Sequence, residues 1–125
     1  MTRKSGVSAT IMPYREGMAG VKQISNQVVW TDSLDFGELE IYIPAGAKTM
    51  GLKIQIRNSG GGDTAWVRFD INGNPSSEDS VTGTTHTYVT LTLDISALSG
   101  FCTLKLQGKV DNLWGQYFGL SFYMI

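Results

Sequence analysis

The sequence has one cysteine, one histidine and three prolines among its 125 residues. A single cysteine excludes an intramolecular disulfide and a cysteine-based zinc cluster. Charged residues make up 17% of the chain, below a usual share of about 25%, and the formal net charge is −1. A charge so close to zero gives no long-range attraction for nucleic acid or an anionic membrane, so neither is an expected partner.

A long apolar run is also missing, most clearly at the start of the chain. Basic residues occur there, but no apolar segment follows them. We therefore expect neither a signal peptide nor a transmembrane segment. The length suits one domain that buries its own core.

Residue patterns that support catalysis are absent as well. His86 lies in a Thr-rich strand entry, and no serine or cysteine occupies a nucleophile turn such as G-x-S-x-G. The glycines at 60–62 lead into a strand pattern, whereas a phosphate-binding loop leads into a helix. Cys102 lies on the apolar side of an alternating run and is expected to be buried and inert. The sequence predicts no catalytic residue, no enzyme activity and no cofactor.

Calcium is the one metal ion that the polar loops suggest. Asp63, Glu78 and Asp79 carry the hard oxygen ligands that calcium prefers. Their spacing matches no calcium-binding loop, and polar turn residues explain them better. No metal site is therefore predicted.

Strict alternation of apolar and polar residues is the strongest positive signal. It is clearest in residues 85–95 (THTYVTLTLDI) and 101–110 (FCTLKLQGKV), which residues 96–100 join as a tight link. Side chains that alternate along a strand give it one apolar and one polar face. Two such strands need a second layer to cover their apolar faces.

Similar runs fill most of the remaining chain, and glycine, proline, asparagine and aspartate separate them. A first strand is expected within residues 21–30, while 58–63 and 72–83 are expected to be loops. We predict an all-β, antiparallel β-sandwich of jelly-roll type with seven or eight strands. In the last strand, Tyr117 is expected on the polar side. The side chains predicted to face the core are Leu52, Ile54, Ile56, Val67, Phe69, Leu91, Leu93, Leu104, Leu106, Phe118, Leu120 and Phe122.

The first 20 residues show no lasting periodicity, so we predict an extended arm at 1–20 and a sandwich domain at 21–125. The arm carries four large apolar side chains that a solvated tail does not need. We expect it to pack against a neighbouring copy and to form a homo-oligomer, with a trimer favoured. A solvated chain end is the alternative. The apolar residues are Ile11, Met12, Tyr14 and Met18.

The polar faces of the predicted strands carry a candidate binding surface. Trp66 and Arg68 share one face, Gln55 and Arg57 share another, and Tyr88 lies on a third. If these strands are neighbours, their aromatic rings and planar polar groups form one face. Such a face suits sugar rings and hydroxyls, and it equally suits a protein partner. An aromatic side chain that merely covers a sheet edge is the third alternative.

Residues 91–109, LTLDISALSGFCTLKLQGK, resemble the penultimate-strand region of jelly-roll carbohydrate-binding modules. That resemblance implies the fold and assigns no binding residue. The Gly- and Thr-rich composition, together with the arm, also resembles the small all-β proteins of tailed-phage particles, such as capsid decoration proteins and fibre modules.

From these features we predict a non-enzymatic structural protein on the surface of a phage-like virion. It would be made in the cytoplasm and act through contacts with other particle proteins. The alternative is a carbohydrate-binding module that binds a glycan on an aromatic and arginine-bearing sheet face.

Overall fold

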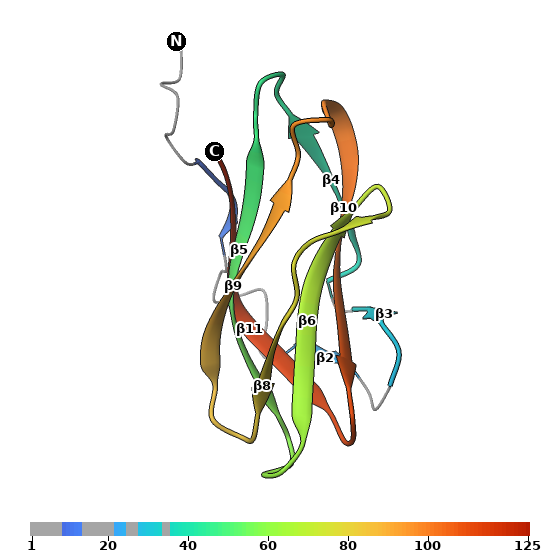
Figure 1. Cartoon of the computed structure of the whole chain (residues 1–125), viewed down its shortest axis with the longest axis vertical. Helices are drawn as coiled ribbons and strands as arrows, with labels where there is room; N and C mark the ends of the chain where they lie inside the picture. The colour runs from blue at the N-terminus through green and yellow to red at the C-terminus, as the bar shows by residue number, and fades with distance from the viewer. Residues whose placement is uncertain (1–8, 14–21, 25–27, 34–35) are drawn as a thin grey trace.

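A computed structural model describes residues 9–13, 22–24, 28–33 and 36–125 (Figure 1). Every regular element in these ranges is a β-strand, and none of their residues forms a helix suited to spanning a membrane. The strands are β1 (Ala9–Pro13), β2 (Lys22–Ile24), β3 (Thr31–Asp32), β4 (Glu38–Ile43), β5 (Thr49–Asn58), β6 (Thr64–Ile71), β7 (Asn74–Pro75), β8 (Asp79–Thr82), β9 (Thr87–Asp94), β10 (Gly100–Val110) and β11 (Gly115–Met124).

The strands form two antiparallel sheets, which confirms the predicted all-β sandwich. The first sheet has the order β1–β11–β5–β9, and β2 also pairs with β11. The second has the order β3–β10–β6–β7, while β4 pairs with β10 and β8 with β6. Figure 1 shows β5, β9 and β11 in one layer and β4, β6 and β10 in the other.

The strands β9 and β10 belong to different sheets, although the sequence presents them as two runs with a tight link. β9 pairs with β5 in the first sheet, and β10 pairs with β4 and β6 in the second. The link therefore crosses from one sheet to the other, and Gly100 enters β10 with a φ of 78°. This arrangement lets the apolar faces of both strands cover each other across the core.

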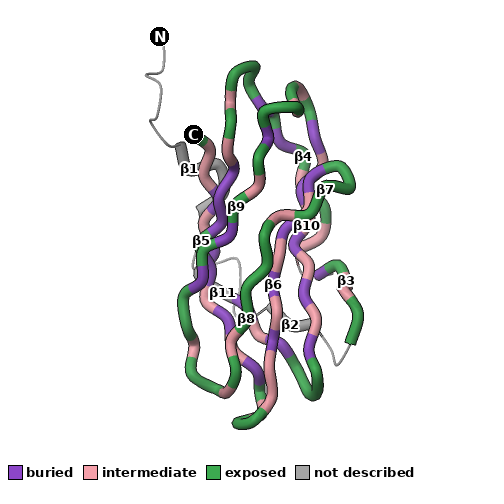
Figure 2. Tube along the Cα trace, in the orientation of Figure 1, coloured by how far each residue is buried: buried purple, intermediate pink, exposed green. Residues whose placement is uncertain are grey.

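The core lies between the sheets, as the alternation predicts. Buried residues alternate with more exposed ones along β6 and β10 (Figure 2). Ten of the twelve side chains predicted to face inward are buried. Leu93 is half-buried, because it lies near the end of the edge strand β9. The side chain of Phe118 lies outside the described residues.

Tyr117 is a correction to the sequence interpretation, which placed it on the polar side of the last strand. Its side chain is fully buried, as is that of Phe122, and Leu120 is buried as well. The pairing of β11 with β5 shifts register between Phe118 and Ser121. A bulge of this kind adds a residue to one strand and changes which side chains face inward.

Two other segments differ from the sequence interpretation. Val28 and Val29, expected in a strand, are 69% and 62% exposed in a bend before β3. The predicted loop at 72–83 contains β7 and β8, which both pair with β6. β8 shows no apolar alternation because it is an edge strand whose residues are mostly exposed. Together with β1, β2 and β3, these short strands bring the number in the described residues to eleven, against the seven or eight expected.

Part of the predicted arm pairs with the sandwich of the same chain. β1 lies alongside β11, with Thr10 opposite Tyr123 and Pro13 opposite Ser121. Ile11 and Met12 belong to β1, whereas Tyr14 and Met18 lie outside the described residues. The boundary at residue 20 and the role of the arm in assembly stay predictions.

Candidate ligand-binding face

The five residues predicted to form one binding face lie on two different sheets. Trp66 and Arg68 lie on β6 of the second sheet. Gln55 and Arg57 lie on β5, and Tyr88 lies opposite Gln55 on β9, all in the first sheet. Outward side chains of the two sheets of a sandwich point in opposite directions. The structure therefore brings together Gln55, Arg57 and Tyr88 but separates them from Trp66 and Arg68.

A cluster of two tryptophans and two cations occupies one end of the second sheet's outer face. Lys109 of β10 lies opposite Trp66 of β6, and Trp30 comes from the segment before β3. The Arg68 guanidinium lies 4.3 Å from the centre of the Trp30 ring. The Lys109 ammonium lies 4.9 Å from the Trp30 ring and 5.4 Å from the Trp66 ring. We call these four residues the tryptophan cluster.

Gln107 connects this cluster to the neighbouring carboxylate. The Arg68 Nε group donates to Gln107 Oε1 at 2.8 Å, and Gln107 Nε2 donates to Asp32 Oδ1 at 2.7 Å. The bond from Gln107, aided by Lys105, lowers the pKa of Asp32 against the opposing effect of partial burial. We call the chain of bonds from Arg68 through Gln107 to Asp32 the relay. These bonds hold its charged groups and donors in fixed orientations.

A polar hollow of about 490 Å³ lies beside the relay on the same face. Lys105 Nζ lies 3.4 Å from carboxylate oxygens of both Asp32 and Glu38. The backbone of Asn72 has a φ of 53°, and its side-chain oxygen accepts a hydrogen bond from Thr103 N at 2.8 Å. The residues that line the polar hollow are Asp32, Glu38, Asp70, Asn72, Gly73, Thr103, Lys105 and Gln107.

An exposed aromatic pair occupies the other end of this face. Tyr42 of β4 lies opposite Phe101 of β10. Their ring centres are 5.2 Å apart in an edge-to-face arrangement, and the residues are 57% and 71% exposed. The sequence analysis did not select them as binding residues. The available signal was an aromatic residue on the polar side of each alternating run.

On the outer face of the first sheet, the charged side chains Lys53 and Arg57 contact other groups of the protein. Lys53 Nζ lies 4.7 Å from the centre of the Tyr88 ring. Arg57 donates to Gln116 Oε1 at 2.6 Å and to the Thr84 carbonyl at 3.3 Å. Two nitrogens of Arg57 are thus bonded to groups of the protein itself.

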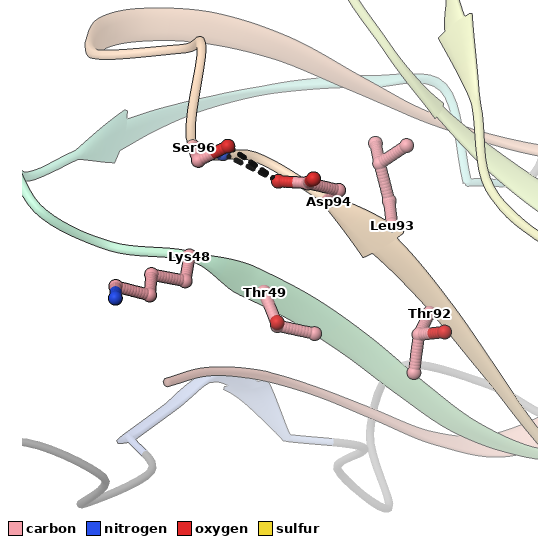
Figure 3. Close-up of a pocket in the computed structure, with 6 residues that line it drawn as sticks. All are labelled: Lys48, Thr49, Thr92, Leu93, Asp94 and Ser96. Carbon is pink, nitrogen blue, oxygen red and sulfur yellow. Dashed lines mark hydrogen bonds between the residues drawn. The ribbon is translucent and has the colours of Figure 1, made fainter.

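A second hollow, of about 460 Å³, opens between β5 and β9 at one end of the first sheet (Figure 3). Asp94 accepts hydrogen bonds from Ser96 N at 2.9 Å and Ser96 Oγ at 2.7 Å. Figure 3 shows Lys48 directed away from Asp94. The lining residues, Lys48, Thr49, Thr92, Leu93, Asp94 and Ser96, include no aromatic ring. The lining of this hollow therefore offers no ring on which a sugar could stack.

The described residues provide no cluster of side chains suited to metal binding. Within the described ranges, His, Cys, Asp and Glu side chains do not gather in groups of three or more that could hold a metal ion. Cys102 is 4% exposed within the core, as its place in the alternation predicts. The chemistry of the second sheet's outer face is that of hydrogen bonding, ring stacking and charge.

No protein-family model matches the sequence, and a search of curated proteins finds no match. Solved structures with a similar fold include carbohydrate-binding modules. One is the CBM36-1 domain of a multidomain xylanase from the hindgut metagenome of Trinervitermes trinervoides, with 13% identity, 95% coverage of both chains and a TM-score of 0.54. Another is the C-terminal CBM6 of LamC, a marine laminarinase from Zobellia galactanivorans, with 15% identity, coverage of 96% and 92%, and a TM-score of 0.55.

A third similar structure is a carbohydrate-binding module, CBM6cm-2, from Cellvibrio mixtus lichenase 5A, in complex with cellotriose. It shares 14% identity, covers 91% of this chain and 97% of its own, and has a TM-score of 0.52. At these identities the similarity establishes the sandwich fold. It supports the resemblance to carbohydrate-binding modules, whereas none of these three structures is a phage particle protein.

Proposed function

We propose that the protein is a non-catalytic glycan-binding module whose ligand lies on the outer face of the second sheet. The observation that carries this proposal is the position of the polar hollow between two groups of aromatic side chains. Sugar rings stack on aromatic side chains, while carboxylates, amides and ammonium groups bond their hydroxyls. A stretch of several sugar rings fits such a face better than a single ring does.

The fold comparison supports this proposal over the virion component that the sequence favoured. The similar structures are carbohydrate-binding modules, and one of them holds cellotriose. Nothing in the described residues favours a particle-surface role, a particle partner or a virion location. Glycan binding, the alternative from the sequence, therefore becomes the main hypothesis.

Replacing an exposed ring of the aromatic pair tests the proposal. Phe101→Ala should weaken glycan binding about 2- to 12-fold, which corresponds to about 0.5–1.5 kcal/mol for one stacking contact. Affinity electrophoresis in gels that contain soluble polysaccharides measures this change. Since Phe101 is 71% exposed and its ring contacts Tyr42 at the surface, its removal should lower the thermal midpoint only slightly.

Tyr88→Ala is the matched control, because Tyr88 is 55% exposed on the opposite sheet. It should bind as the unaltered protein does. Equal losses in the two variants would move the site away from the second sheet. An unaltered protein that binds no polysaccharide of a broad panel would overturn the proposed function.

A further inference from the structure

We infer that the glycan carries an acidic group, a carboxylate or a sulfate, which binds between Arg68 and Lys109 in the tryptophan cluster. The inference rests on the proposed function and names the chemical class of its ligand. It follows from how the two cations are held and from where the carboxylates of the same face lie.

Arg68 presents an oriented guanidinium without a carboxylate partner. Gln107 fixes its Nε edge at 2.8 Å, and the Trp30 ring lies 4.3 Å from the guanidinium carbon. Within the described residues, the ion pairs are those of Lys105, and no bond engages the Nη groups of Arg68. A planar guanidinium held in this way is prepared for two parallel hydrogen bonds to an anion.

Lys109 adds a second positive charge at the same place. Its ammonium lies within 5.4 Å of both tryptophan rings, and no described carboxylate pairs with it. The rings attract the cation through their electron-rich faces but accept no strong hydrogen bonds from it. An anionic ligand oxygen supplies the acceptor that the rings lack.

Among the described residues, no carboxylate of this outer face pairs directly with Arg68 or Lys109, and Asp32 is linked to Arg68 through Gln107. Asp32 and Glu38 contact Lys105, and Asp70 lies opposite Lys105 on β6. Glu40 lies further along, opposite Thr103. Lys105 and Lys109 are four residues apart on β10, which spans about 13 Å. The face therefore has a cationic end and an acidic middle.

This separation of charge also indicates how many acidic groups the glycan carries. A chain with an acidic group on every sugar would place negative charges against the carboxylates of the polar hollow. A mostly neutral chain with an acidic sugar at one position satisfies both regions. Neutral hydroxyls then face the hollow, and the single anion faces Arg68 and Lys109.

The test compares matched acidic and neutral polysaccharides. One pair is a glucuronic-acid-substituted xylan and the same polymer after reduction of its carboxyl groups. The second pair is a lightly sulfated glucan and its unsulfated parent. The full chain should bind the acidic member of one pair about tenfold tighter, and added salt should diminish the difference. The pair that shows the preference identifies a carboxylate or a sulfate as the group.

Three variants locate the effect. Arg68→Gln and Lys109→Gln should each remove most of the acidic preference while neutral binding persists. Lys53→Gln, which alters the cation over the Tyr88 ring of the opposite sheet, should keep the preference. Thermal midpoints verify folding, and Lys109→Gln serves alone if Arg68→Gln unfolds.

The outcomes separate the inference from the proposed function. Equal binding of acidic and neutral members overturns the acidic ligand and leaves glycan binding intact. A loss of acidic preference in Lys53→Gln as large as that in Lys109→Gln would also overturn the acidic ligand and leave glycan binding intact. Failure to bind any member of either pair, in every buffer, overturns the glycan-binding function itself.

Discussion

Tyr117 is the residue that connects the two sheets beneath the tryptophan cluster. Its ring is fully buried, and its hydroxyl donates to the carbonyl of Trp66 at 2.9 Å. Burial raises the pKa of this hydroxyl above its ordinary value, so it remains a hydrogen-bond donor. The bond supports the backbone of β6 from the core side, while Trp66 and Arg68 project from the other side.

Gly115 makes room for this contact. A Cβ atom at that position would lie 2.5 Å from the Tyr117 hydroxyl oxygen, and the buried ring has no free space to move into. Gly115→Ala should therefore destabilise the protein by about 1–3 kcal/mol, as overpacked core positions do. Urea unfolding measures the loss.

Gly51→Ala is the control for this prediction. A Cβ at Gly51 would overlap the Tyr123 ring, but that ring is half-buried on the outer side of the first sheet and can swing away. The loss should be smaller than for Gly115→Ala. Equal losses of stability in the two variants would contradict the prediction, because they would show that the buried Tyr117 ring moves aside as easily as the half-buried Tyr123 ring.

Asn58 shows a different route by which a polar residue becomes part of the core. The sequence places it in a loop, but it ends β5 and is fully buried. Its side-chain nitrogen donates to the carbonyls of Thr64 and Asn112, and its side-chain oxygen accepts from Gly60 N. A buried amide with these partners is satisfied, and it fastens the 59–63 loop to the 111–114 loop at one end of the sandwich.

At the scale of elements, β9 and β10 have the same alternation but different environments. β10 is central, with β3 and β4 on one side and β6 on the other. β9 ends the order of its sheet and pairs with β5. Consequently, equivalent apolar positions on the two strands are covered to different extents.

Leu104→Ala and Leu93→Ala should reveal this difference. Leu104 is fully buried in β10, so its truncation should cost about 2–5 kcal/mol. Leu93 is half-buried in β9, and its truncation should cost clearly less, because solvent already reaches the side chain. Chemical denaturation measures both changes. A loss at Leu93 equal to that at Leu104 would contradict the edge position of β9.

At the scale of the whole molecule, each sheet has one strand that two short strands flank along one side. β1 and β2 pair with opposite ends of β11, as β3 and β4 do with β10. β11 also pairs with β5 over most of its length. The contact between β1 and β11 thus adds to a strand that is already held in the sheet.

Deleting residues 1–20 tests what this terminal segment contributes. The remaining chain should unfold cooperatively at a lower temperature, because it keeps the pairs around β5, β6 and β10 and loses β1. Calorimetry measures the transition. Loss of all cooperative folding would show that the domain begins before residue 21.

Light scattering on the same two proteins tests the assembly role predicted for the arm. That role is supported if the full-length protein has the mass of several chains and the protein without residues 1–20 has the mass of one chain. A mass of one chain for both proteins would confine β1 to its own sandwich.

Alternation in the sequence predicted the long strands and most of the core, but not the short strands β7 and β8. Alternation within 52–57, 65–71 and 101–110 predicts both the strands and the side chains that face inward. This succeeds because the period of two along a strand is a local property, and a one-residue slip would expose the apolar set. The same rule failed at Tyr117, because the bulge depends on how β11 pairs with β5.

The strand order within the two sheets sets which side chains share a face. Trp66 and Arg68 resemble Gln55, Arg57 and Tyr88 in pattern, yet the two groups lie on opposite sheets. Trp30 reaches Arg68 only because β3 pairs with the far end of β10. Strands that pair in a sandwich are often distant in sequence. Alternation predicts the two faces of each strand but not which strands lie beside it. The candidate binding face therefore became visible only when strand order brought Trp30, Arg68 and Lys109 together.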